Sequence, residues 1–392
     1  MVGYKVLSIP FKIRLYDVDE YDAADIVKTY TNILANRLFA DTCPEYEPNK
    51  KVEIEDSSSF VEVGENINLD TIPDKVVVLR IYANKVTIPV ICESTATIRE
   101  ILVKCCDTLH ITDNSLFGLA IKSSDIKVHR YETTKNEYYF VENETVLTKS
   151  FNLFAKYNKD LYDCKDKSCY QFYLKMKHFP THVSNVQCRN TIKQMFYNLR
   201  NNFLNNQTLF SMYNEDFYMY YSYLMIIAEG IKDMRNEVPF MEYYPQWIRK
   251  TRGIQNIQQV LMSLQNNKPL TCEDAMVQFC NEAIDGFFKL NRHFYYLETS
   301  KTIQSDIHAL LGVSKEGIES WEINYRQLTV KMSCNVWKQI DNISHSRKKL
   351  SITNLSYDQQ KFYTERTHVA SYINTFCKFF HLQQLKNHIN NL

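Results

Sequence analysis

The stretch HALLGVSKEGIESW, residues 308–321, predicts the fold of the last part of the chain. An apolar run at 309–313 ends in a polar turn, and apolar residues resume at Ile318. This pattern is typical of a β-hairpin, in which we expect Gly317 to have a positive φ. A phosphate-binding loop needs Lys and Ser or Thr after its second glycine, and Ile318 and Glu319 stand there instead. A nucleophile elbow needs glycine where Glu316 stands. The stretch therefore predicts a turn without catalytic chemistry.

The composition indicates a globular protein with real cores. The 392 residues are 45% hydrophobic and 13% aromatic, which is enough for two or three domains. No run of 18 apolar residues occurs and the start is too polar for a signal peptide, so we expect a cytosolic protein. Only 8 glycines disfavour glycine-rich cofactor loops, and we expect no cofactor. The 11 cysteines are scattered through the predicted helices and strands, which favours reduced thiols.

Charge is divided unevenly along the chain. Residues 1–74 carry 15 acidic and 7 basic side chains, whereas the remainder carries 39 basic and 30 acidic ones. This moderate, dispersed basic excess suits an anionic membrane surface better than a nucleic-acid groove, so we expect no nucleic-acid partner. The acidic part contains one helical pattern at 22–39 and a polar segment at 43–60 that is typical of a linker.

From residue 75 the pattern changes to short strands. KVVVLRIY and VTIPVI flank a tight turn, and a helix follows whose start has the capping-box pattern of Thr97 and Glu100. The segments LFGLAI, EYYFVE, FNLFA and QFYLKMKHF then predict further strands up to Pro180. Two strands, a helix and more strands are the order of a ubiquitin-like β-grasp unit.

Residues 187–298 predict a bundle of about four helices, the last of them covering 271–297. Asn214 and Thr271 are candidate N-caps. The aromatic run at 217–225 has helical spacing, which favours a core over a base-stacking surface. Strands return after Thr299, and a helix from about 366 to 389 closes the chain. Several strands followed by one C-terminal helix predict a PH/PTB-like barrel.

The order of these parts resembles the FERM family, and several segments resemble it too. EYYFVENETVL and QFYLKMKHFP are similar to first-lobe strands, whereas HALLGVSKEGIESW and NVWKQIDNISHSRKKLSI are similar to third-lobe strands. YYPQWIRKTRG and HFYYLETSKT resemble the willin/Expanded type. The resemblance implies an α+β, three-lobed FERM clover. Its parts would be an acidic, partly helical and partly disordered extension at 1–74, a ubiquitin-like lobe at 75–180, a helical lobe at 181–300 and a PH/PTB-like lobe at 301–392.

For function, the resemblance implies a non-enzymatic scaffold at the plasma membrane or cell cortex. Such a scaffold would link the cytoplasmic tails of membrane or junctional proteins to signalling of the Hippo type. The alternative is the regulatory region of a larger signalling enzyme, such as a tyrosine phosphatase or kinase. The chain itself lacks the short motifs of both catalytic domains.

The resemblance also implies two candidate surfaces. Weak lipid binding would use basic residues of the first and third lobes, namely Lys122, Lys127, Arg130, Lys348 and Lys349. The ezrin class has a further lysine where Thr353 and Asn354 stand here, so we expect no specific phosphoinositide clamp. A peptide groove would lie between an edge strand at 348–352 and the C-terminal helix. Its candidate residues are Lys349, Leu350, Ser351, Ile352, Ile373, Phe376 and Phe380.

One cysteine and histidine set has a superficial likeness to a zinc site. Cys164, Cys169, His178 and His182 are too closely spaced for a zinc finger, in which a helix carries both histidines. Pro180 lies between the two histidines and prevents such a helix. We therefore expect no metal site.

Overall fold

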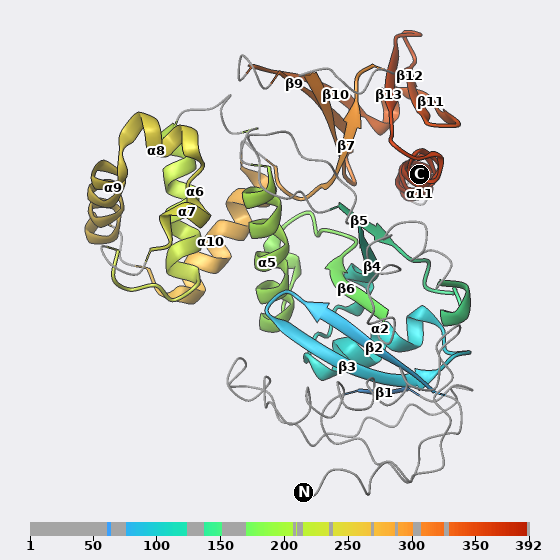
Figure 1. Ribbon diagram of the computed structural model, residues 1–392, viewed down its shortest axis with the longest axis horizontal. Helices are drawn as coiled ribbons and strands as arrows, with labels where there is room; N and C mark the ends of the chain where they lie inside the picture. Colours follow the sequence, from blue (N-terminus) through green and yellow to red (C-terminus); the bar gives the residue numbers. More distant parts are fainter. Residues whose placement is uncertain are drawn as a thin grey trace, which may run out of the picture. The chain divides into compact units, whose positions relative to one another are not determined.

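A computed structural model describes the chain at residues 61–63, 76–123, 137–150, 170–206, 209, 215–234, 238–267, 270–286, 289–300, 307–324 and 329–389. Figure 1 labels the helices and strands of these residues. The chain divides into two compact units, the first comprising 1–125, 138–178 and 187–194 and the second the remainder. None of the helices within these ranges is both long and apolar enough to cross a membrane. The predicted helix at 22–39, the segment at 43–60, the strand at 151–155 and Asn214 lie outside the described residues.

The first unit is built on a six-stranded mixed sheet in the order β1-β3-β2-β6-β4-β5. Its elements are β1 (Val61–Val63), β2 (Val76–Ala83), β3 (Val86–Glu93), α2 (Ile98–Thr108), the 3-10 turn η3 (Asn114–Leu116), β4 (Phe117–Ser123), β5 (Glu137–Phe140) and β6 (Tyr170–Met176). β2 runs parallel to β6 in the middle of the sheet and antiparallel to β3. This is the predicted β-grasp arrangement.

Short-range sequence signals explain the turn between β2 and β3 and the start of α2 in the first unit. Asn84 has a φ of 57° in the turn between β2 and β3, a conformation that asparagine tolerates better than most residues. The predicted capping box is present, because the Thr97 hydroxyl accepts from the Glu100 N–H and the Glu100 carboxylate accepts from the Thr97 N–H at 2.7 Å. β1 lies within the expected N-terminal extension and pairs with β3, so part of that extension belongs to the first sheet.

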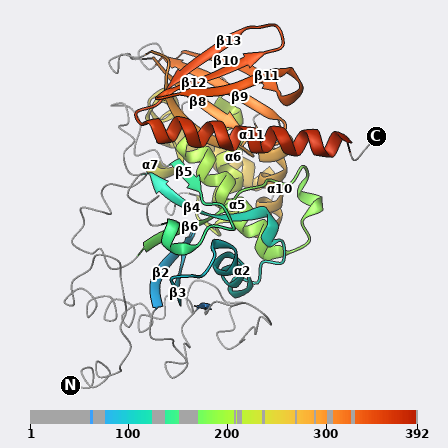
Figure 2. The same cartoon turned by 90° about the vertical axis from the view of Figure 1, so that its right-hand side faces the viewer.

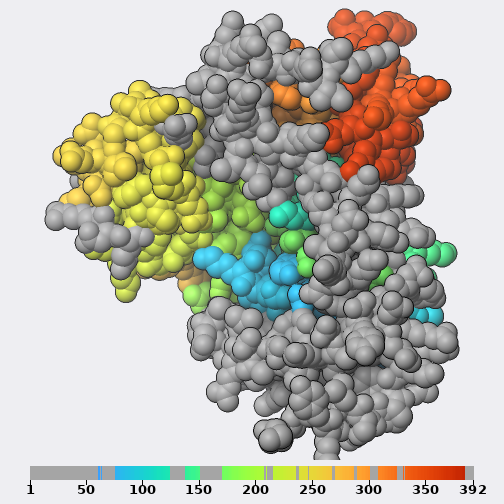
Figure 3. Space-filling view, viewed as in Figure 1, coloured from blue at the N-terminus to red at the C-terminus, as the bar shows by residue number. Residues whose placement is uncertain are grey.

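The second unit begins with helices. They are η4 (Val183–Asn185), α5 (Arg189–Asn205, shared with the first unit), α6 (Glu215–Ala228), α7 (Phe240–Tyr243), α8 (Gln246–Arg252), α9 (Ile254–Asn267) and α10 (Cys272–Asp285). Their core is aromatic: the rings of Phe203 and Tyr221 stack at 5.6 Å, and both side chains are fully buried. The run at 217–225 is largely buried, which confirms the prediction of a core. In the space-filling view α8 and α9 are drawn in yellow, whereas α5 is green (Figure 3).

The predicted helix at 271–297 is wrong in its second half. Its start is confirmed, because the Thr271 hydroxyl accepts from the Asp274 N–H. The helix ends at Asp285 before Gly286, and His293–Glu298 forms a strand instead. Aromatic residues there alternate between two faces of a sheet, and this packing prevails over the helical spacing. The sheet of the third lobe therefore begins before the expected boundary at residue 300.

That sheet has seven antiparallel strands in the order β10-β9-β8-β7-β13-β12-β11. They are β7 (His293–Glu298), β8 (Ile307–Val313), β9 (Gly317–Asn324), β10 (Thr329–Val336), β11 (Ile340–Ser346), β12 (Lys349–Asn354) and β13 (Gln359–Tyr363), with η6 (Trp337–Gln339) before β11 and α11 (Thr367–Ile389) at the end. α11 lies along the sheet and packs on β11 and β12 (Figure 2).

The opening hairpin is confirmed, but the predicted role of Gly317 is wrong. β8 and β9 pair from Val313↔Ile318 to Ile307↔Asn324. Gly317 does not have a positive φ; the described glycines with positive φ are Gly230 and Gly253. The Ser314 hydroxyl shapes the turn by accepting from the N–H groups of Glu316 and Gly317 at 3.2 and 3.4 Å. Glycine is needed at 317 for space, since a Cβ there would lie 2.8 Å from the Val336 Cα.

Candidate functional site

The most distinctive surface of the third lobe is the outer edge of β11. In the described part of the chain β11 pairs with β12 on one side and has no strand on the other. Ile340 and Ile343 are buried, whereas the other residues of the strand are exposed. The register shifts between Ile340 and Asn342, which marks a bulge at the start of the strand. An unpaired strand of this kind offers backbone N–H and C=O groups to another chain.

α11 borders this edge and is held to the sheet by aromatic contacts. The His293 ring lies 5.1 Å from the Phe376 ring and 6.2 Å from the Phe380 ring. Near the other end of the contact, the His381 ring stacks on Trp337 at 5.7 Å. The Trp337 indole N–H donates to the Ser314 carbonyl at 3.1 Å, so the turn of the opening hairpin also supports this packing.

The structure corrects the predicted edge strand. Residues 349–352 lie in β12, which is an inner strand between β11 and β13. Leu350, Ser351 and Ile352 are buried, and Lys349 is half-buried. The three candidate residues of the helix are buried as well and pack toward the sheet, namely Ile373, Phe376 and Phe380. Because register and strand order depend on distant parts of the chain, the sequence pattern placed the groove one strand away from the edge.

The predicted basic residues have different environments. Lys348 is exposed in the turn between β11 and β12, beside Arg347, which is also exposed and has a φ of 52°. Lys122 is half-buried in β4, where burial lowers its pKa. Lys127 and Arg130 lie outside the described residues. Sequence reasoning missed Arg347, although it directly precedes the two lysines.

Asn354, one of the two residues that stand where the ezrin class has a lysine, makes its contacts inside the third lobe. The Asn354 amide donates to the Asn335 side-chain oxygen at 2.8 Å, and Gln360 donates to the Ser333 hydroxyl at 2.8 Å. Ser320 and Ser333 share a hydrogen bond of 2.6 Å. These uncharged groups join β9 and β10 to β12 and β13, so Asn354 serves the interior of the lobe.

No group of three or more potential metal ligands occurs among the residues that the structure describes. His182 instead lies 3.2 Å from an Asp285 carboxylate oxygen, and Cys164 and Cys169 lie outside the described residues. The eight described cysteines are unpaired. The expectation that the chain holds no metal remains a prediction.

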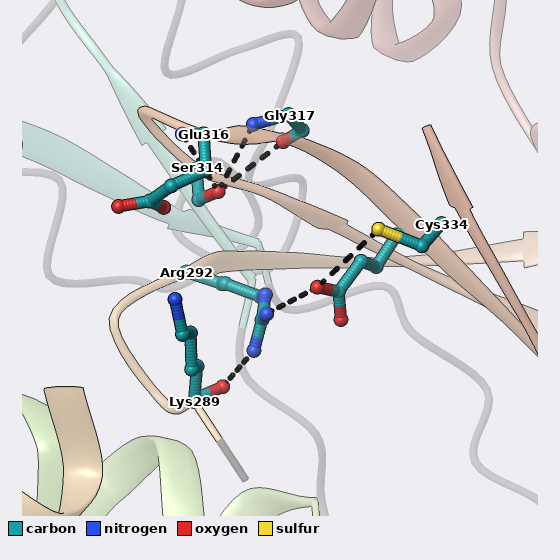
Figure 4. A network of polar contacts seen from close by, with 7 residues as sticks. Lys289, Arg292, Ser314, Glu316, Gly317 and Cys334 are labelled. Atoms are coloured by element: carbon teal, nitrogen blue, oxygen red, sulfur yellow. Dashed lines mark hydrogen bonds and ion pairs between the residues drawn. The ribbon is translucent and has the colours of Figure 1, made fainter. Parts of the chain in front are cut away.

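A polar network on the β9 side of the sheet has a structural role (Figure 4). The Arg292 guanidinium donates to the Glu319 carboxylate and to the Lys289 carbonyl, and it lies 5.9 Å from the centre of the Trp321 ring. The Asn202 amide donates to the carbonyl of Arg292 at 2.8 Å. The network thus ties the segment that follows the helices to the seven-stranded sheet.

Comparison with known proteins agrees with this architecture. Residues 304–388 match the family model of the FERM C-terminal PH-like domain. This region follows a β-grasp sheet and a group of helices. The chain has the FERM fold.

Solved FERM structures match at low sequence identity. The FERM and C-terminal domain complex of Drosophila Merlin matches with a TM-score of 0.53 and 15% identity, over 80% of this chain and 98% of that one. The human Myosin 7b C-terminal MyTH4-FERM domain, solved in complex with the harmonin-a PDZ3 domain, matches with a TM-score of 0.59 and 14% identity, over 79% of this chain and 60% of that one. No curated protein matches the sequence. The chain thus spans about 60% of the MyTH4-FERM chain.

Proposed function

We propose that this FERM chain is an adaptor that binds the tail of another protein along β11. The unpaired edge of β11 beside α11 is the observation that supports this function most directly. An extended peptide added to that edge would form backbone hydrogen bonds with β11, while the adjoining side chains would set the sequence preference.

Two adjacent proline substitutions test this binding mode. In an antiparallel pair, successive residues point their N–H groups alternately toward the partner strand and away from it. Ser344 and His345 pair with Ser351 and Leu350, so one of the variants Ser344→Pro and His345→Pro removes a hydrogen bond to β12 and destabilises the lobe. The other removes only an N–H at the open edge, which proline tolerates.

The open-edge variant should remain folded and lose its peptide partners. Proximity labelling in cells should enrich membrane or junctional proteins with cytoplasmic tails for the wild-type chain and lose them for this variant. Equal enrichment by both folded proteins would contradict binding along β11.

The proposed location is the cytoplasmic side of the plasma membrane or the cell cortex. Exposed Arg347 and Lys348 would add weak attraction to anionic lipid, at about 1 kcal/mol for each charge near the surface. The resemblance of two segments to the willin/Expanded type motivates a role in Hippo-type signalling. A fluorescently labelled chain tests this location. If a chain without β11 and α11 leaves the cortex, while a chain with Arg347 and Lys348 replaced by Gln stays there, the protein partner determines the location.

The second candidate is a regulatory FERM region of a larger signalling enzyme. Its support is that the MyTH4-FERM chain extends well beyond the part that matches this one. A longer transcript that encodes a phosphatase or kinase domain in the same reading frame would favour this candidate over a separate adaptor.

A further inference from the structure

The first-unit sheet carries a lysine whose charge the described residues do not compensate. Side chains alternate along β6, so Phe172, Leu174 and Met176 are buried on one face while Tyr173, Lys175 and Lys177 lie on the other. Lys175 is nevertheless only 7% exposed. Among the described residues it has no hydrogen bond and no ion pair; its ammonium lies 4.5 Å from the centre of the Tyr138 ring.

The charge that acts on Lys175 together with burial has the same sign. Burial, together with the Lys122 ammonium, lowers the pKa of Lys175 to about 8. Lys122 lies on β4, the strand that pairs with β6, and burial lowers its pKa too. The cation–π contact with Tyr138 offsets only part of the cost of removing an ammonium group from water. Lys122 and Lys175 thus lie on one face of the sheet, and among the described residues Lys175 has no acidic partner.

Lys177, on the same face, has an acidic partner for its charge. It is also buried, but its Nζ lies 4.0 Å from a carboxylate oxygen of Glu142. It also packs over Gly118, where a Cβ would come within 3.2 Å of the lysine Cδ and 2.9 Å of the Phe140 ring. Lys177 is therefore paired and packed, whereas Lys175 two residues away has only the Tyr138 ring.

Aromatic side chains surround the uncompensated charge. The Tyr173 ring stacks on Tyr82 at 5.1 Å and meets the Tyr138 ring edge-on at 5.4 Å. Tyr82, Tyr138 and Tyr173 are all half-buried. Such a partly closed setting strengthens the attraction between lysine and an incoming anion.

We propose that Lys122 and Lys175, with Tyr138 and Tyr173 beside them, bind the phosphate group of a soluble phosphate monoester on this face of the first-unit sheet. Two ammonium groups on one face suit a doubly charged oxyanion, and a phosphate would supply a negative charge for Lys175. The site involves different strands from the peptide edge at β11, so it stands independently of the proposed adaptor function.

The test uses the full-length chain, with inorganic phosphate as the probe. Thermal unfolding is followed at fixed pH and ionic strength, with phosphate replacing chloride. A ligand that binds only the folded state raises the midpoint, so the wild-type midpoint should rise with phosphate concentration. Lys175→Met should unfold at a higher temperature than the wild type without phosphate, because it removes an uncompensated buried charge, and it should not respond to phosphate.

Lys177→Met is the matched control, since it removes the lysine that directly follows β6 and lies on the same face. It should keep the phosphate response. The proposal is overturned if phosphate shifts the Lys175→Met midpoint as much as that of the wild type, or does not shift the wild type. It is also overturned if Lys175→Met is less stable than the wild type without phosphate, because the lysine would then serve packing alone.

A vesicle experiment separates a soluble ligand from a lipid headgroup. Neutral vesicles with and without a phosphoinositide are mixed with the wild type and with Lys175→Met. A soluble ligand predicts no difference in vesicle binding between the two proteins. Phosphoinositide-dependent binding that Lys175→Met abolishes, without any response to inorganic phosphate, would overturn the soluble ligand and assign the phosphate to a lipid.

Discussion

The Arg292–Glu319 ion pair gives a direct test of how the second unit is held together. The two side chains are only 6% and 15% exposed. Glu319→Ala leaves the Arg292 charge buried with the Lys289 carbonyl and the Trp321 ring as its remaining partners. Removing one partner of a buried pair typically costs about 3–5 kcal/mol, so we expect a loss in this range in the free energy of unfolding.

A double substitution separates charge compensation from simple loss of contact. Arg292→Met with Glu319→Met removes both charges and keeps much of the apolar volume, so it should cost less than Glu319→Ala alone. Glu322→Ala changes an exposed carboxylate on the same strand and should alter stability by no more than about 0.5 kcal/mol.

Urea unfolding monitored by tryptophan fluorescence suits this test. All three tryptophans, at 247, 321 and 337, lie in the second unit, so the signal reports that unit. If Glu319→Ala and Glu322→Ala lower the free energy of unfolding by the same amount, the buried pair does not stabilise the unit as argued. The single variants Arg292→Met and Glu319→Met complete the cycle: if their losses in the free energy of unfolding add up to that of the double variant, the two charges are not coupled.

Three further predictions concern other parts of the chain. Gly317→Ala should cost about 1–3 kcal/mol in a urea titration, because the new methyl group overlaps the Asn335 carbonyl oxygen of the paired strand; a wild-type midpoint would contradict this. In the folded state the pKa of Lys175 is lowered from 10.5 to about 8, so between pH 8 and 10.5 the unfolded chain binds more protons than the folded one. The free energy of unfolding should therefore rise by about 3 kcal/mol as the pH increases across this range. Lys175→Met should lack this rise in unfolding measured as a function of pH. A chain that begins at residue 75 loses Val61–Val63 and exposes β3 as an edge, so light scattering should show more aggregation than for a chain that begins at residue 60.

The sequence was sufficient to predict features that depend on residues close together in the chain. The hairpin at 308–321, the capping box at Thr97 and the cap at Thr271 depend on residues a few positions apart, and all three were predicted. The order of β-grasp strands, helices and PH-like strands also followed from changes in periodicity along the chain.

The errors arose where distant residues decide the structure. The aromatic residues at 293–298 fit both a helix and a strand, and pairing with β8 decides between them. Strand order likewise depends on distant pairing, so the sequence did not distinguish the inner strand β12 from the edge strand β11. Nothing in the local pattern separates Lys175 from Lys177, and only the folded sheet shows that one has an acidic partner.

The strand order of the seven-stranded sheet also has a consequence for how it forms. β7 to β10 and β11 to β13 are two runs in which every strand pairs with its neighbour in sequence. Among the described residues the runs meet at one register pair, Tyr363↔Glu298. Neighbouring strands close short loops and pair quickly, whereas joining β13 to β7 closes a loop of more than 60 residues at a higher entropic cost. The seam between the two runs should therefore form last during refolding and exchange its amide hydrogens first in the native protein.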